Sequence, residues 1–180
     1  MGEKPTDRCS QAVESLTVCM RFITDLTFYS VPDVLRNAIG GSAGFVLLAR
    51  IFAATANRIY SEVRRTCCPQ ETSPVPLFQR LERVTALIAG ASYRARAYVR
   101  QEEGRIRLVF TGLEHLRGSV LNAAPIIGVI MGMIEAVGGR AVPLTSRDGL
   151  RHAPRSAYRV YPDRIEGDTL EVVVVPPEQA

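Results

Sequence analysis

The stretch SVLNAAPIIGVIMGMIEAVGGRAVPLT, residues 119–145, decides the fold that this sequence predicts. Asn122 is a good helix N-cap, and Pro125 is tolerated in a first helical turn. The Gly138-Gly139 pair supplies the residue of positive φ at which helices commonly end. The stretch therefore predicts an apolar helix, a glycine stop and a short strand over residues 140–145.

This helix carries one charged residue, Glu135, so it is either buried on several sides or spans a membrane. A membrane span needs about 20 apolar residues, and this run is shorter and interrupted. We therefore predict a buried central helix. A buried, unpaired Glu135 would be costly, so we expect it to pair with an arginine or to lie near the helix end. A role in a pocket is the alternative.

Small residues recur at every fourth position of the helix and form one ridge. The ridge consists of Ala124, Gly128, Gly132 and Ala136. Such spacing lets another backbone or a flat ligand approach closely. Three interpretations stay open: ordinary close packing against a neighbouring element, the wall of a ligand pocket, and a dimer seam. For a pocket, Phe52, Phe110 and Met131 are candidate apolar lining, and Glu135 is a candidate polar group.

The composition favours a folded, soluble protein. The chain has 180 residues, of which 47% are hydrophobic, and a net charge of +4 that comes almost entirely from arginine spread along the chain. We expect a tail over residues 1–8 and one domain over 9–180, with a helical part (9–90) and a sheet part (91–176). The spread charge supports an anionic partner only weakly.

The cysteines indicate a reducing compartment. Cys9, Cys19, Cys67 and Cys68 fit neither a CxxC metal knuckle nor a regular disulfide framework. The polar N-terminus shows no signal peptide, and no transmembrane segment is expected. We therefore predict a cytoplasmic protein with reduced thiols.

Hydrophobic periodicity predicts four helices before the hairpin, over residues 9–28, 33–39, 42–65 and 75–89. The third has the most regular apolar stripe, formed by Phe45, Leu48, Phe52, Ala56, Ile59 and Val63. Its arginines, among them Arg50 and Arg58, lie off that stripe, on a solvated face or on one that meets an anion.

At Ser92 the apolar period changes from about 3.6 to 2, which predicts a β-hairpin with its turn at Glu103-Gly104. One face is apolar. The other carries five arginines, namely Arg94, Arg96, Arg100, Arg105 and Arg107. That face is either a solvated outer surface or an anion-binding surface. Sheets that bind nucleic acid usually add exposed aromatic residues, and only Tyr98 is available, so nucleic-acid binding is the less favoured interpretation.

Two further strands are predicted over residues 155–161 and 169–175. Helices followed by mostly antiparallel strands define an α+β fold. We expect an N-terminal helical layer packed on a mostly antiparallel sheet, with the central helix between the hairpin and the C-terminal strands.

The sequence contains no phosphate loop, dinucleotide fingerprint, zinc-protease motif or nucleophile elbow. His115 and His152 have no nucleophile or paired carboxylate near them in the sequence. We therefore predict a protein that is not an enzyme and that has no cofactor and no metal.

From Tyr93 onward the chain resembles the ligand-binding superfamily shared by vinyl-4-reductase-type domains, hydrocarbon-binding proteins, heme-NO-binding relatives and the TRAPP trafficking subunits. The resemblance rests on the hairpin, on Gly128 to Gly139 with the strand that follows, and on Ala157-Tyr-Arg-Val-Tyr161. The chain is also similar to a large group of paralogous myxobacterial proteins of about this length. Many vinyl-4-reductase-type domains carry cysteines after the central helix, whereas residues 146–158 have none, so neither metal nor heme is carried over.

The resemblance implies helices covering an antiparallel sheet, an apolar pocket, frequent dimerisation and a role in sensing or scaffolding. The leading hypothesis is a non-enzymatic regulatory module that binds an apolar small molecule or lipid. The alternatives are an interaction or scaffold subunit with a homodimer or partner interface, and a nucleic-acid binder that uses the arginine face.

Overall fold

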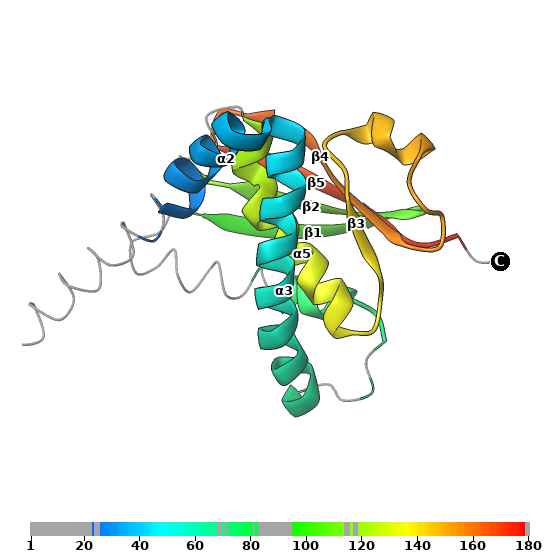
Figure 1. Ribbon diagram of the computed structural model, residues 1–180. Helices are drawn as coiled ribbons and strands as arrows, with labels where there is room; N and C mark the ends of the chain where they lie inside the picture. The colour runs from blue at the N-terminus through cyan, green and yellow to red at the C-terminus, as the bar shows by residue number, and fades with distance from the viewer. Residues whose placement is uncertain are drawn as a thin grey trace, which may run out of the picture.

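The structure is a computed structural model that describes residues 26–67, 72–80, 95–113 and 119–178, together with Ile23, Gln70, Glu82 and Leu116. Three layers are visible in Figure 1: a five-stranded sheet, a central helix α5 (Val120–Ala136) and an outer helix α3 (Gly41–Cys67) that lies along α5. The predicted α+β fold, with helices packed on the sheet, is confirmed.

The sheet has the strand order β1-β2-β5-β4-β3. The hairpin β1 (Arg96–Glu102) and β2 (Arg105–Thr111) turns at Glu103-Gly104 as predicted, and Gly104 has φ +70°. β2 then pairs antiparallel with β5 (Thr169–Val175), and β5 pairs antiparallel with β4 (Tyr158–Glu166). The short β3 (Ala141–Pro143) lies parallel to β4 at the opposite edge.

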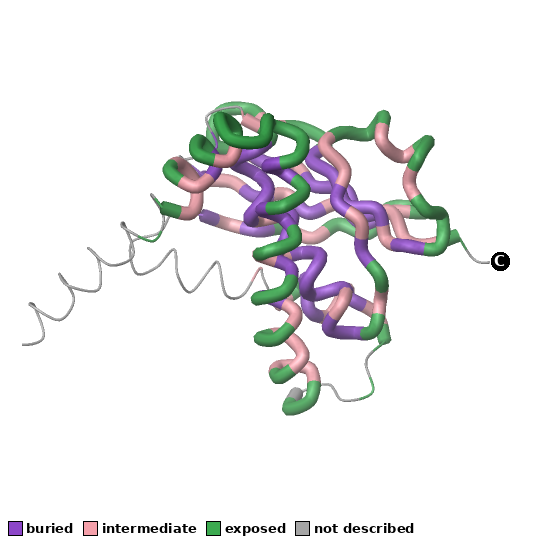
Figure 2. Tube along the Cα trace, in the orientation of Figure 1, coloured by how far each residue is buried: buried purple, intermediate pink, exposed green. Residues whose placement is uncertain are grey.

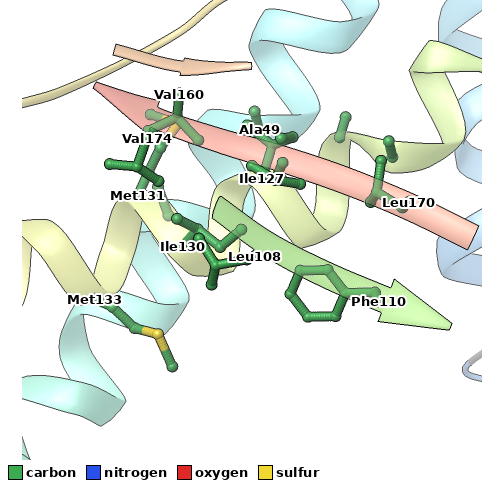
Figure 3. Packing of buried hydrophobic residues seen from close by; sticks show 14 of the residues in the cluster. Ala49, Leu108, Phe110, Ile127, Ile130, Met131, Met133, Val160, Leu170 and Val174 are labelled. Carbon is green, nitrogen blue, oxygen red and sulfur yellow. The ribbon is translucent and has the colours of Figure 1, made fainter. Parts of the chain in front are cut away.

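Central helix α5 is buried because it is covered on both sides. One side packs on α3 and the other on the sheet, and its 17 residues include thirteen buried ones. Figure 3 shows Ile127, Ile130 and Met131 among the sheet residues Leu108 and Val174. The prediction of a buried central helix is therefore confirmed. Among the helices that the structure describes, none is long and apolar enough to cross a membrane.

The helix end was predicted correctly and its beginning was not. Gly138 follows α5 with φ +87°, and the Gly139 N–H donates to the Ile134 carbonyl at 3.0 Å. The N-cap is Ser119 rather than Asn122. Asn122 is buried in the first turn, where its side-chain amide donates to the Leu116 carbonyl at 3.3 Å.

The other helices differ from their predicted bounds by a few residues. α2 (Val31–Ile39) begins earlier because Pro32 suits a first helical turn, and residues 26–30 form a short π-helix, η1 (Leu26–Ser30). Val75 to Arg80 is helical as predicted. Residues 9–22 of the first predicted helix and 83–89 of the fourth lie outside the described residues.

Two strands near the C-terminus also differ from prediction. β3 ends at Pro143 rather than Thr145, and β4 begins at Tyr158 rather than Arg155. A 3₁₀-helix, η2 (Arg147–Arg151), and turns occupy the interval, and no alternation in that interval signalled them. β5 has the bounds that the valine-rich pattern predicted.

Each edge of the sheet carries a feature that hinders pairing with another strand at one point. At one edge β3 has only three residues and ends in Pro143. At the other edge, the outward-pointing N–H of Val99 on β1 donates to the Glu82 carboxylate at 2.5 Å.

Candidate functional site

The small-residue ridge of α5 lies against α3. A Cβ added to Gly128 would lie 2.4 Å from the Ala49 carbonyl oxygen and 2.5 Å from the Phe52 Cβ. A Cβ added to Gly132 would lie 2.5 Å from the Ala56 Cβ and 2.6 Å from the Ala53 carbonyl oxygen. Backbone atoms of α3 fill the space in front of both glycines, so close helix packing is what the ridge does here.

Most of the other predicted pocket residues are buried parts of the core. The core contains Phe110, Ala124, Met131 and Ala136, while Phe52 is partly buried and packs against them. They belong to one core but not to one place in it. Phe52 of α3 lies against Gly128 of the ridge, whereas Phe110 lies on β2, in the sheet that packs on the other side of α5 (Figure 3).

Glu135 pairs with an arginine, as one of the two expectations for it stated. Its carboxylate accepts from Arg50 of α3 at 3.2 Å, and its side chain is 23% exposed. Burial raises the pKa of Glu135 above its ordinary value, and the Arg50 charge opposes that increase. The pair joins the outer helix to the central helix beside the ridge.

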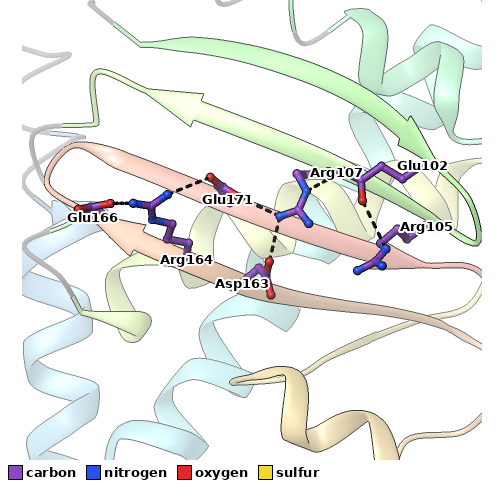
Figure 4. A network of polar contacts seen from close by, with 7 residues as sticks. All are labelled: Glu102, Arg105, Arg107, Asp163, Arg164, Glu166 and Glu171. Carbon is purple, nitrogen blue, oxygen red and sulfur yellow. Dashed lines mark hydrogen bonds and ion pairs between the residues drawn. The ribbon is translucent and has the colours of Figure 1, made fainter.

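The arginine face of the hairpin is the outer face of the sheet, where acids pair with Arg105 and Arg107. Arg107 contacts Glu102, Asp163 and Glu171 at 3.0, 2.9 and 2.8 Å, and Arg105 lies 3.4 Å from Glu102 (Figure 4). Hydrogen bonds to Glu102 first, and then to Asp163 and Glu171, hold the pKa of Arg107 above its ordinary value despite partial burial.

These contacts link strands β1, β2, β4 and β5. Arg164 extends them, because it contacts both Glu166 and Glu171 (Figure 4). Of the remaining predicted arginines, Arg100 is exposed, Arg96 is half-buried, and Arg94 lies outside the described residues. Arg105 and Arg107 thus belong to a cross-strand ion network, so these two of the five arginines are engaged by acids of the sheet.

The outer surface of α3 is the feature that the sequence reasoning missed. Val46, Leu47 and Ile51 are 42%, 44% and 51% exposed, and Ala43 and Ala54 are exposed beside them. We call Ala43, Leu47, Ile51 and Ala54, with Val46 on their flank, the α3 stripe. In Figure 2 the exposed side of α3 faces away from the buried α5.

A signal for this stripe was present in the sequence. Ala43, Leu47, Ile51 and Ala54 step by four, four and three, which is a second helical apolar period on the segment that also carries the buried one. The buried stripe was predicted correctly at Phe45, Leu48 and Ala56. The prediction was wrong at Ile59, which is 55% exposed. α5 ends at Ala136, whose carbonyl accepts from Arg64, so little of α5 remains to cover α3 beside Ile59.

The described residues offer no metal centre, since no group of three or more His, Cys, Asp or Glu side chains among them is placed to hold an ion. His152 is exposed and follows η2 directly. His115, Cys9, Cys19 and Cys68 lie outside the described part of the chain, and the side chain of Cys67 does too.

Comparisons with protein-family models, with curated proteins and with solved structures found no match to this chain. The resemblance to the vinyl-4-reductase and TRAPP superfamily therefore stays a prediction. Among the described residues, the α3 stripe groups exposed apolar side chains on one side of a single helix.

Proposed function

We propose that this protein is a non-enzymatic interaction module that docks another protein surface on the α3 stripe. The observation that carries the proposal is the exposure of Leu47, Ile51 and Val46 on one side of a helix whose opposite side is firmly packed. Isolated exposed apolar residues are ordinary, whereas a contiguous apolar strip on a rigid helix is typical of an interaction site.

The packing of the ridge favours this function over binding of an apolar small molecule or lipid. The space in front of Gly128 and Gly132, where a ligand was expected, holds the backbone of α3. The ligand hypothesis stays a prediction that native mass spectrometry of the purified protein tests. A retained apolar molecule would support it, and a clean mass of the chain alone would count against it.

The ion network favours interaction over nucleic-acid binding in the same way. Arg107 is held by three carboxylates, and Arg105 by one. Release of counterions, which supplies most of the affinity for nucleic acid, needs cations that are free to meet phosphates. A cytoplasmic location, which the cysteine pattern favours, forms part of the proposal.

Photo-crosslinking tests the proposed function. A photoreactive phenylalanine analogue is placed at Ile51 of the full chain, in the cells that encode it, and the matched control carries it at Ile59. Both positions are exposed isoleucines of α3, but only Ile51 lies on the α3 stripe. Crosslinks to protein from position 51 alone support the proposal; equal crosslinking from both positions, or none from position 51, overturns it.

A further inference from the structure

We infer that Arg155 and Arg159 form a binding site for an acidic peptide segment, and that residues 176–178 of the chain itself occupy this site. The site lies at the start of β4 and does not include the α3 stripe, so its test does not depend on the proposed function. Three features of the described residues carry the inference: a buried guanidinium with one unused donor, contacts to both the backbone and the carboxylate of the bound segment, and the exposure of that segment.

Arg159 is a buried cation on the outer face of the sheet. Its neighbours on β4, Tyr158 and Val160, pack on the core, and successive side chains of a strand point to opposite faces. The Arg159 side chain is only 6% exposed, and its Nε–H has no hydrogen-bond partner among the described residues. A buried ion pair often stabilises a fold no more than apolar side chains of similar volume would, and an unused buried donor costs free energy. Stability therefore does not account for this guanidinium, whereas recognition of a ligand does.

The contacts made to residues 176–178 are those that recognise an acidic peptide. Arg159 donates through one Nη to the Pro176 carbonyl at 2.9 Å and through the other to the Glu178 carboxylate at 3.3 Å. Arg155 donates to the second carboxylate oxygen of Glu178 at 3.2 Å, and the Arg155 carbonyl accepts from the Glu178 N–H at 3.0 Å. Two of these contacts involve the peptide backbone and two the carboxylate. The ligand class is therefore a peptide with a glutamate two residues after an accessible carbonyl.

Residues 176–178 can be replaced by another segment. They follow β5 without forming a strand or a helix, and the Glu178 side chain is 53% exposed although it binds a buried guanidinium. Its contacts with Arg155 and Arg159, at 3.2 and 3.3 Å, are longer than the separation of about 2.7–2.9 Å that is usual between two charged groups. A peptide that places its carboxylate closer, or that also accepts from the Nε–H of Arg159, would form stronger contacts than the chain's own segment does.

The chain's own segment competes with any external peptide. Because residues 176–178 are joined directly to β5, their effective concentration at the site is on the order of millimolar. The apparent affinity for an external peptide is lowered by the fraction of molecules in which the site is already filled. Removal of the Glu178 carboxylate should therefore increase the affinity for an external peptide.

NMR titration of the full chain with the blocked peptide acetyl-Pro-Pro-Glu-amide, which has the sequence of residues 176–178, tests the inference. Glu178→Ala is expected to bind this peptide at least about tenfold more tightly than the wild type, which corresponds to a site about nine-tenths filled by the chain itself. The matched control is Glu166→Ala, which removes a carboxylate from Arg164 on the same strand, where both side chains are exposed. Equal affinity of Glu178→Ala and the wild type, or no binding by either, would overturn the inference.

A further variant and a small anion identify what the site recognises. Arg159→Met in the Glu178→Ala background is expected to abolish binding of the peptide, and acetyl-Pro-Pro-Gln-amide is expected not to bind Glu178→Ala. Acetate lacks the two backbone contacts and should bind Glu178→Ala at least about tenfold more weakly than the peptide does. Equal affinities for acetate and the peptide, or binding that survives Arg159→Met, would overturn recognition of a peptide at this site.

Hydrogen exchange of the wild type tests the same site without any substitution. The Glu178 N–H donates to the Arg155 carbonyl, so it is released when an external peptide takes the place of residues 176–178. Acetyl-Pro-Pro-Glu-amide is expected to raise the exchange rate of this N–H in proportion to the fraction of molecules that bind the peptide. Exchange of the Val172 N–H in β5 should stay unchanged. Peptide binding that leaves exchange at Glu178 unaltered would overturn the inference.

Discussion

Two glycines determine how closely the outer and central helices approach. Gly128 and Gly132 have α3 backbone atoms where a Cβ would lie, at distances of 2.4 to 2.6 Å. Because protein interiors are packed at the density of organic crystals, the neighbouring atoms cannot move away without disturbing both helices. The residue type at these two positions therefore sets the spacing of a whole layer.

Gly132→Ala is predicted to destabilise the fold. The added methyl group clashes with α3, which costs about 1–3 kcal/mol, although alanine is the better helix former by about 1 kcal/mol. Urea denaturation measures the difference. The control is Gly41→Ala, which has no atom within 4 Å of the new Cβ and should leave stability nearly unchanged. Equal stability of the two variants would show that the close approach is absent.

Glu135→Gln is predicted to alter the pH dependence of stability. Burial raises the folded-state pKa of Glu135 above its ordinary value, so between the unfolded and folded pKa values the folded state binds more protons than the unfolded one. The contribution of Glu135 to stability is then lost as pH rises through that interval. The free energy of unfolding of the wild type, relative to that of the Gln variant, should therefore be smaller above these two pKa values than below them. Urea titrations at several pH values measure this difference. A difference that does not change with pH contradicts the raised pKa of Glu135.

At the scale of elements, the sheet uses its outer face to join four strands through one guanidinium. Arg107 of β2 contacts Glu102 of β1, Asp163 of β4 and Glu171 of β5 (Figure 4). Its side chain is only 19% exposed, so the network is less screened by water than a typical surface ion pair. The arginines of the hairpin thus have a structural role that their sequence pattern did not reveal.

Arg107→Met is predicted to cost about 1–3 kcal/mol at neutral pH, the range for hydrogen bonds to charged groups. Three carboxylates would then face one another without the cation between them, and their mutual repulsion adds to the loss. Arg105→Met, which removes the same charge from the same strand but a single partner, should cost less than about 1 kcal/mol. Thermal or urea unfolding of both variants at neutral pH makes the comparison, and equal losses would contradict the network.

At the scale of the whole molecule, residues 176–178 of the C-terminal segment are hydrogen-bonded to Arg159 of β4. Arg159 is buried, with its guanidinium donating to the Pro176 carbonyl at 2.9 Å and to the Glu178 carboxylate at 3.3 Å. Glu178 also accepts from Arg155 at 3.2 Å, and its N–H donates to the Arg155 carbonyl. A buried cation thus couples the end of the described chain to the sheet.

Glu178→Ala is predicted to destabilise the fold by about 1–3 kcal/mol, because it leaves the Arg159 charge buried without its carboxylate. Arg159→Met should be close to neutral, since an apolar residue of similar volume can replace a buried ion. When Arg159 is already Met, Glu178→Ala should lower the free energy of unfolding by less than it does in the wild type. Chemical denaturation of the wild type, the two single variants and the double variant measures this coupling. Strict additivity would show that the two side chains do not interact.

The sequence by itself determined the local elements: the glycine-ended apolar helix, the hairpin with its turn at Gly104, and the valine-rich strand β5, because periodicity and turn chemistry act over a few neighbouring residues. It also identified the ridge of small residues on α5. Only the tertiary structure decided that α3 packs on Gly128 and Gly132 of this ridge, that Arg107 is held by acids from three other strands, and that Leu47 and Ile51 are exposed on the outer side of α3. Each of these depends on which surfaces meet, and residues such as Arg107 and Glu171, 64 positions apart in the chain, become neighbours through long-range packing that no local pattern encodes.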